Sequence, residues 1–170
     1  IFEDDYDSEF RYANRPVGAV QGLEPGGRVI YVGSFSKTLF PGLRVAYLVV
    51  PDGLAQDFRQ ALRQTGQEPP LAIQAALHDF IELGHFARHV RRMRGIYAGR
   101  RAAVVDALTR HARSLGQPLT ADGGLQLTLQ LNRGLDDKVL ASAAREGGFG
   151  AEALSRYGLR PGAPGGLVLG

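Results

Sequence analysis

The stretch Tyr31-Val-Gly-Ser-Phe-Ser-Lys-Thr-Leu-Phe-Pro-Gly-Leu-Arg44 joins a short apolar run to a segment of small polar residues that carries one lysine, and ends on an arginine. Lys37 is one of only two lysines in the chain, the other being Lys138. A desolvated lysine amine loses its proton and forms a Schiff base, which a guanidinium does not do. The placement of Lys37 between two serines and a threonine therefore indicates a chemical role for its amine.

The residues around Lys37 favour a phosphate site at the end of a strand. Residues 29–32 form a β-branched and aromatic run that is typical of a buried strand, and Gly33 ends it. The loop that follows offers backbone N–H groups for an anion, and Arg44 offers a bidentate clamp. Its hydroxyl groups belong to Ser34, Ser36 and Thr38. Taken alone, the stretch fits a polar loop with a solvated lysine equally well.

The chain begins with Ile1-Phe-Glu-Asp-Asp-Tyr-Asp7, an apolar start that runs directly into an acidic cluster. Acidic clusters are usually solvated faces. This cluster follows a predicted strand, however, and open α/β sheets bind ligands at the ends of their strands. A carboxylate beside a pyridine nitrogen keeps that ring protonated, and a phenol beside the ring hydroxyl tunes it further.

Three motifs resemble a known family in their residues, order and spacing. They are Glu3-Asp-Asp-Tyr-Asp-Ser-Glu-Phe-Arg-Tyr12, Ser34-Phe-Ser-Lys37 and Pro41-Gly-Leu-Arg44. Together they resemble the fold-type I aminotransferases of class I/II, which use pyridoxal 5′-phosphate (PLP). The first motif resembles more narrowly the aminotransferase-like domain of the MocR/GabR regulators, a branch of the GntR family of transcription factors. The resemblance runs along the whole chain, which covers only the later part of such a domain.

The resemblance implies a role for each matching residue. Lys37 would carry the internal aldimine, a Schiff base with PLP, and would move the substrate proton. Asp4 would pair with the protonated pyridine nitrogen, with Asp5 as the alternative. Tyr6 would hydrogen-bond the ring hydroxyl. The phosphate would be held by Ser34 or Ser36 together with Arg44.

Parts of the family pattern have no match in this chain. Amino-transfer enzymes of this fold usually bind the substrate carboxylate on a late arginine, but residues 165–170 contain none. Arg156 and Arg160 are the candidates nearest to that position. The earlier half of the large domain and the winged helix-turn-helix of a regulator are also missing. The chain begins inside a predicted strand and ends just after another, so we expect a piece of a longer protein.

Hydrophobic periodicity predicts an α/β chain, and the resemblance makes it the later part of a fold-type I large domain followed by an α+β small domain. We expect these parts over residues 1–96 and 97–170, joined by a long amphipathic helix over about 85–113. Expected strands cover 29–32, 45–50, 124–131, 149–154 and 166–169, and expected helices cover 54–64, 71–83 and 136–145. We expect a connection over residues 8–28, a cap at Asp52, a packed helix at 71–83 and a break at Gly116-Gln-Pro.

Composition narrows the class of protein. With 44% hydrophobic and 22% charged residues the chain is globular, and without cysteine it has no disulfide or thiolate metal site. No stretch has the length and apolarity of a membrane span, and a cytoplasmic protein is expected. The dense arginines of residues 88–101 predict a solvated face rather than a nucleic-acid surface. His85 and His89 have the spacing of a metal-ligand pair but lack a carboxylate partner, so a surface or cap role is expected.

Three functions follow from these observations. The first is a PLP-binding effector domain that senses an amino compound, in a homodimer that contacts DNA only through a winged helix-turn-helix outside this chain. The second is an active aminotransferase that moves an amino group from an amino acid to a 2-oxo acid. The third is a structural fragment that no longer binds PLP. We expect the first, and the sequence does not identify the amino compound.

Overall fold

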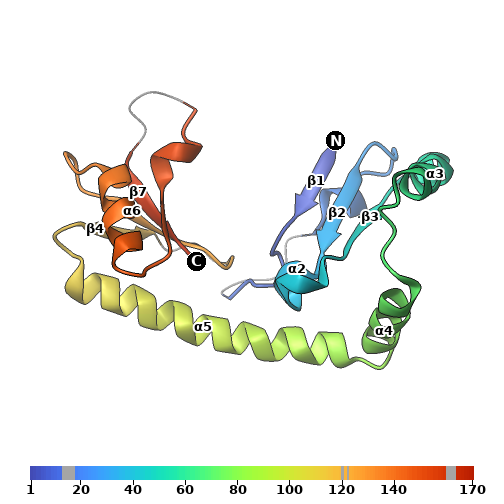
Figure 1. Ribbon diagram of the computed structural model, residues 1–170, viewed down its shortest axis with the longest axis horizontal. Coiled ribbons are helices and arrows are strands. Elements are labelled where there is room, and N and C mark those ends of the chain that lie inside the picture. The colour runs from blue at the N-terminus through green and yellow to red at the C-terminus, as the bar shows by residue number, and fades with distance from the viewer. Residues whose placement is uncertain (13–17, 120, 122, 160–163) are drawn as a thin grey trace. The chain divides into compact units, whose positions relative to one another are not determined.

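The computed structural model describes residues 1–12, 18–119, 121, 123–159 and 164–170 of the 170-residue chain (Figure 1). The chain divides into two compact units, one formed by Ile1–Glu9 and Arg15–Met93 and the other by Phe10–Asn14 and Arg94–Gly170. The long helix expected from the sequence is present as α5 (His85–His111), which contains residues of both units. None of the helices in the described ranges has the length and apolarity needed to cross a membrane.

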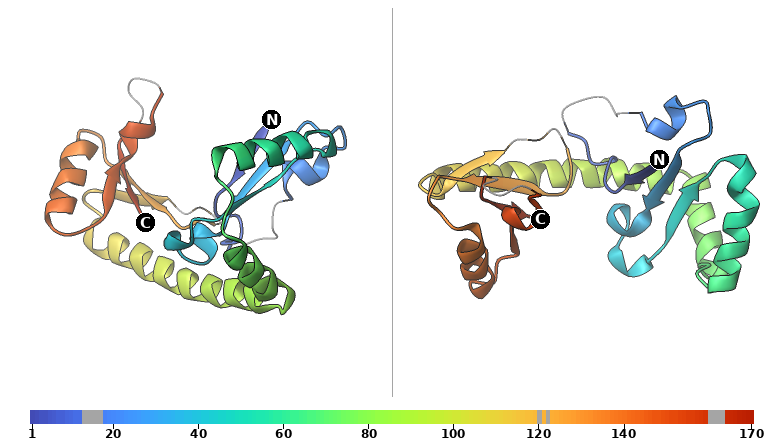
Figure 2. Two further views of the ribbon diagram at one scale, coloured as in Figure 1. Left: turned by 45° about the vertical axis from the view of Figure 1, so that its right-hand side comes forward. Right: turned by 90° about the horizontal axis from the view of Figure 1, so that it is seen from above.

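A three-stranded sheet in the order β1-β2-β3 forms the centre of the first unit (Figure 2). β1 (Phe2–Asp5) and β2 (Ile30–Ser34) are parallel, and β3 (Ala46–Val49) is antiparallel to β2. β-Branched and aromatic residues in β2 and β3 suit an extended backbone. The strands expected here are therefore confirmed, and the connection between β1 and β2 contains only the short helix α1 (Val20–Leu23) in its described part.

The segment between β2 and β3 differs from the loop that the sequence predicts. It contains a single helical turn, α2 (Phe35–Thr38), followed by the 3-10 helix η1 (Pro41–Leu43). The hydroxyl oxygen of Ser34 accepts a hydrogen bond from the Ser36 N–H and caps α2. Pro41 opens η1, where the N–H that proline lacks would have no partner inside the helix. α2 lies directly beyond the end of β2 (Figure 1). Lys37 is therefore on a helical turn at the end of this strand.

Two helices follow β3 in the first unit. α3 (Ala55–Thr65) is preceded by the 3-10 turn η2 (Asp52–Leu54), so Leu54 occupies the N-cap and the capping role expected for Asp52 is wrong. α4 (Leu71–Glu82) begins after Pro70, but in the described chain it buries only Leu77. Its apolar residues occur on all sides, so that one contact face cannot cover them, and the expectation of a packed helix is wrong.

The second unit is an antiparallel sheet in the order β4-β5-β7-β6, with α6 (Asp137–Glu146) packed on β6 and β7 (Figure 1). The strands are β4 (Gly116–Leu119), β5 (Leu127–Leu131), β6 (Ala151–Ala153) and β7 (Gly166–Leu169), and the 3-10 helix η3 spans Leu154–Tyr157. Apolar residues alternate along β5 as expected, so its leucines fill the core beside Ala141 and Leu167.

Sequence reasoning missed β4, because Gly116-Gln-Pro resembles a break. β4 is an edge strand of this sheet, and proline is tolerated there because its outer side needs no hydrogen-bond donor. A side chain on Gly116 would collide with the backbone of Gln130 on β5. Glycine therefore permits the close pairing of β4 with β5.

Candidate cofactor site around Lys37

Most of the predicted cofactor residues of the first unit, all except Arg44, lie where two parallel strands end. β1 and β2 pair with Asp4 opposite Val32 and Asp5 opposite Gly33, so both strands finish at the same edge of the sheet. Tyr6 follows β1, and α2 with Lys37 follows β2. The carboxyl edge of a parallel pair is where open α/β sheets bind their ligands.

Lys37 and Tyr6 meet at this edge. The Lys37 Nζ atom lies 5.0 Å from the centroid of the Tyr6 ring, within the range of a cation–π contact. Tyr6 is 43% exposed, so the face around the two residues is open to a ligand. The structure thus brings the predicted Schiff-base lysine beside the predicted phenol.

Several contacts hold the turn that carries Lys37. The Phe35 N–H donates to the Val45 carbonyl at 3.0 Å, which ties the start of α2 to the segment entering β3. Thr38 is 2% exposed, and its hydroxyl donates to the Phe35 carbonyl at 3.4 Å. Ser34 uses a lone pair to cap Ser36, and its hydroxyl proton stays available for an anion. Of the two predicted phosphate serines, Ser36 therefore lies on the same turn as Lys37 and Ser34 caps that turn.

The acidic residues of β1 divide between structural and open positions. Glu3 accepts hydrogen bonds from the Val20 and Gln21 N–H groups at 2.8 and 2.9 Å. Asp4, by contrast, is exposed, and within the described ranges no hydrogen bond or ion pair of its side chain is found. Glu3 therefore serves the start of α1, whereas Asp4 remains open to a ligand.

Like Glu3, Asp5 is hydrogen-bonded within the protein. Its carboxylate accepts from the Ser8 N–H at 3.1 Å, from the Ser8 hydroxyl at 2.6 Å and from the Tyr31 hydroxyl at 2.5 Å. Burial, together with the hydrogen bond that Tyr31 donates to Asp5, raises the pKa of Tyr31 far above its usual range. The phenol therefore stays a donor. Of the two aspartates weighed for the pyridine nitrogen, Asp5 is the one held by the fold.

Near the end of β2, Gly33 is in close contact with the ring of Tyr47. The ring of Tyr47 lies against Gly33, in the space that a side chain there would occupy. The same ring lies 5.3 Å from Phe35 and 6.1 Å from Tyr31, measured between ring centroids. Glycine at this position therefore lets an aromatic cluster support the residue that opens α2.

Arg44 lies at the end of η1 and is exposed. Its φ of 51° is the only positive value on a non-glycine residue in the described ranges. Side chains rarely adopt this left-handed conformation, and such outliers cluster at functional sites. Arg44 lines a hollow of about 520 Å³ with Ala46 and Phe58, and no hydrogen bond joins it to Ser34 or Ser36 in the described structure.

Of the two arginines predicted for a substrate carboxylate, Arg156 belongs to the second unit. Arg156 lies on η3, with its Nη1 atom 3.9 Å from Glu152 Oε2, and its side chain is 60% exposed. Such an exposed pair is weak and leaves the guanidinium accessible. Arg160 falls outside the described residues.

His89 is a residue whose place the sequence reasoning missed. Its Nε2 atom lies 2.9 Å from the carbonyl oxygen of Thr38, the last residue of α2, so of the two expected roles, surface or cap, His89 has the cap role. The described residues contain no cluster of three histidine or acidic side chains that would hold a metal. The helical spacing of Phe86, His89 and Val90 places them on one face of α5, which is the signal that marks His89 as inward-facing.

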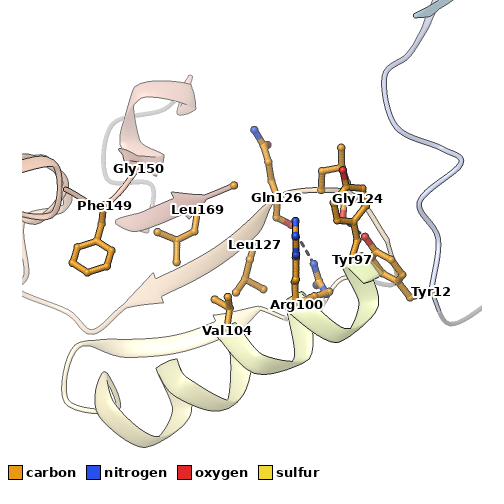
Figure 3. Close-up of a pocket in the computed structure, with 13 residues that line it drawn as sticks. Tyr12, Tyr97, Arg100, Val104, Gly124, Gln126, Leu127, Phe149, Gly150 and Leu169 are labelled. Atoms are coloured by element: carbon orange, nitrogen blue, oxygen red, sulfur yellow. Dashed lines mark hydrogen bonds between the residues drawn. The ribbon is translucent and has the colours of Figure 1, made fainter. Parts of the chain in front are cut away.

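The second unit contains a hollow of about 500 Å³ beside α5 (Figure 3). Apolar side chains such as Val104, Leu127 and Leu169 line it, and none of its lining residues is acidic or a lysine. The Arg101 guanidinium donates to the carbonyls of Gln126 and Ala121 at 3.2 and 2.9 Å, so this member of the arginine face is structural. The hollow therefore lacks the chemistry that gathers around Lys37.

Comparison with known proteins agrees with this geometry. Residues 4–149 match the family described as aminotransferase class I and II. The chain is 46% identical over 170 residues to the probable rhizopine catabolism regulatory protein MocR of Rhizobium meliloti, and 32% identical to the HTH-type pyridoxine biosynthesis transcriptional regulator PdxR of Corynebacterium glutamicum. Both alignments include the whole of this chain, but they include only 34% of MocR and 36% of PdxR.

A solved structure gives the same result for the fold. The kynurenine aminotransferase of Pyrococcus horikoshii, in complex with PMP, superposes with a TM-score of 0.84 at 26% identity, over 99% of this chain and 42% of that one. The expected fold, part of a fold-type I aminotransferase, is confirmed. The chain therefore belongs to the PLP-dependent family of class I and II aminotransferases, of which it spans a part.

Proposed function

We propose that this chain is the PLP-binding effector part of a MocR/GabR-type transcriptional regulator, with PLP held as a Schiff base on Lys37 and an amino compound as its signal. The observation that carries the proposal is the strand edge at which the Lys37 amine lies 5.0 Å from the Tyr6 ring while the Asp4 carboxylate is open. An amine, a phenol and a carboxylate at one edge are the groups that this cofactor needs for its aldehyde, ring oxygen and ring nitrogen.

The chemistry of these side chains fits the cofactor. When bound, PLP supplies an electron-accepting ring that acidifies the bonds at the α-carbon of an amino compound. The Asp4 carboxylate would keep a proton on the ring nitrogen, and the Tyr6 hydroxyl would donate to the ring oxygen. The Lys37 amine would take up and return the α-carbon proton. The hydroxyl of Ser34 or Ser36 and Arg44 would hold the phosphate.

The choice of a regulator rests on the relatives. MocR and PdxR are named as regulators, and the resemblance to MocR extends through the whole chain. In the proposal, DNA is bound only by a winged helix-turn-helix outside this chain, and the protein acts as a cytoplasmic homodimer. Binding of an amino compound through Arg156 or Arg160 would complete the signal.

An active aminotransferase is the second candidate, because the residues of the Lys37 edge serve that reaction equally well. The 33% identity over 118 residues to the 2-aminoadipate transaminase of Thermus thermophilus favours it. In this case the chain moves an amino group from an amino acid to a 2-oxo acid. The same residues keep their roles, and the difference lies in whether the cofactor returns to its aldehyde form.

Absorption titration with PLP tests the cofactor assignment. The full-length protein and the 170-residue chain are titrated beside Lys37→Ala and Lys138→Ala, which removes the other lysine of the chain. We expect a visible band in the full-length protein and in its Lys138→Ala variant, and none in Lys37→Ala. A band that survives Lys37→Ala, or no band in the full-length protein, contradicts the proposal.

Adding amino acids and then 2-oxo acids separates the two candidates. A regulator is expected to show a stable shift of the band that a 2-oxo acid does not reverse. An aminotransferase is expected to lose the band with the amino acid and to regain it with the 2-oxo acid. Steady turnover of a donor and acceptor pair would replace the first candidate by the second.

A further inference from the structure

The beginning of α5 contacts α2 on both sides of Lys37. The Phe86 ring meets Phe35 edge to face, with ring centroids 5.8 Å apart and planes at 79°. The His89 Nε2 atom lies 2.9 Å from the Thr38 carbonyl oxygen. Phe86 and His89 are three positions apart on one face of the helix, and the residues that they touch are the first and last of α2.

The Thr38 carbonyl needs a partner of this kind. It belongs to the last residue of α2, and the carbonyl groups at the C-terminal end of a helix have no N–H partner within that helix. Thr38 is 2% exposed, so water is largely excluded from it. A buried carbonyl without a donor is costly, and a carbonyl only accepts, so His89 must be the donor through its Nε2–H.

The imidazole is itself held in place. The ring of Phe80 on α4 lies 6.5 Å from the His89 ring in an edge-on arrangement. His85, by comparison, is exposed and interacts with Arg88 on its own helix. His78 is also exposed, with its side chain 71% accessible. Among these three histidines, His89 is the one that reaches across to the Lys37 turn.

We propose that His89 is a positioning residue for Lys37, fixing the turn that aims the amine at the Tyr6 edge of the site. The inference deepens the proposed PLP function and rests on it. The hydrogen bond that His89 donates to the Thr38 carbonyl fixes the C-terminal end of α2. Phe86 fixes the N-terminal end through its contact with Phe35. Loss of the bond frees the residues next to Lys37 and lowers the fraction of molecules with the amine in place.

Two polar substitutions separate the bond from the bulk of the side chain. His89→Gln places an amide N–H where the imidazole Nε2–H lies, whereas His89→Asn is shorter and does not reach Thr38. His78→Asn is the matched control on an exposed histidine. Hydrogen exchange of residues 35–39 is measured in the full-length protein without PLP, and PLP affinity is measured from the visible band.

We expect His89→Asn to speed amide exchange in residues 35–39 by roughly three- to tenfold and to weaken PLP binding by a similar factor, as loss of one hydrogen bond predicts. His89→Gln and His78→Asn are expected to match the unaltered protein in both measurements. In the unaltered protein, the His89 Nε2–H is expected to give a slowly exchanging NMR signal.

Three results would overturn the inference. The first is unchanged exchange in His89→Asn, and the second is faster exchange with unchanged PLP affinity, which makes His89 merely structural. The third is a failure of His89→Gln to restore either property. If the unaltered full-length protein shows no Lys37-dependent band, the proposed function fails instead, and the exchange data still decide whether His89 holds the turn.

Discussion

Asp137 offers a sharp test of how the second unit is held together. The residue is 5% exposed, and its carboxylate accepts from the Ser155 N–H at 2.8 Å, the Ser155 hydroxyl at 2.7 Å and the Gly166 N–H at 3.2 Å. These bonds join α6 to η3 and β7. Because η3 carries Arg156, the carboxylate also anchors one of the arginines proposed to bind the amino compound.

The size of the effect follows from these contacts. Asp137→Ala removes three bonds to a charged acceptor, each worth about 1.5–3 kcal/mol, and recovers the cost of burying the carboxylate, so we expect a net loss of about 3–4 kcal/mol in the free energy of unfolding. The neighbouring Asp136 is a matched control, because it caps α6 through the Lys138 and Val139 N–H groups but is exposed. Asp136→Ala is expected to cost about 1 kcal/mol.

The pH dependence gives an independent check. Burial raises the pKa of Asp137, but the hydrogen bonds from Ser155 and Gly166 outweigh it, and the folded pKa lies below the ordinary value. The folded state thus binds fewer protons, so this contribution is complete above the unfolded pKa of about 3.9 and is lost as pH falls through the folded value. The stability gap between the unaltered protein and Asp137→Asn is therefore expected to narrow as the pH falls below about 4.

Urea unfolding followed by circular dichroism measures these differences in the free energy of unfolding, provided that its dependence on urea concentration is the same in all variants. The reasoning is refuted if Asp137→Ala costs no more than Asp136→Ala, or if the gap to Asp137→Asn widens on acidification. Either result would mean that the donors of Ser155 and Gly166 find other partners.

The other predictions concern the Lys37 edge. Arg44→Gly relieves a positive φ worth about 1 kcal/mol and adds a similar entropy cost, so urea unfolding is expected to change by less than about 1 kcal/mol while PLP binding weakens roughly tenfold. Gly33→Ala drives a methyl group into Tyr47 and is expected to cost about 1–3 kcal/mol in the same assay. Asp5→Asn is expected to cost about 1–2 kcal/mol without PLP, whereas Asp4→Asn leaves stability within about 0.5 kcal/mol and shifts the visible band of the complex. Equal losses for the two aspartates would contradict their separate roles.

Local patterns predicted much of the fold because the periods of the elements are strong. The alternation along β5 and the long helix α5 both appear in the structure. The sequence did not predict β4, because a proline such as Pro118 is acceptable on an edge strand but not inside a sheet, and edge position is a property of the assembled sheet. The helical turn α2 was not predicted, because a serine that caps a helix is equally common in a loop.

The motifs around Lys37 predicted which residues gather at the site but not the contacts that support them. The sequence placed Tyr6 and Lys37 each after a strand, and the parallel pairing of β1 with β2 brings the two residues together. The donor role of His89 toward Thr38 joins residues 51 positions apart, and no local pattern specifies such a pair. The spacing on α5 marks the face of the helix, but only the folded chain shows what that face meets.

The geometry of a strand explains why the carboxylates of β1 differ in their hydrogen bonding. Successive side chains point to opposite faces, so Glu3 and Asp5 share one face while Asp4 lies on the other. On the first face, hydrogen-bond donors from α1, Ser8 and Tyr31 satisfy both acids and offset the cost of bringing them together. On the second face, Asp4 meets no such donors within the described ranges. A pyridinium nitrogen would supply the donor that this position lacks, and this is the role proposed above for Asp4, whereas Glu3 and Asp5 are already satisfied by donors of the protein.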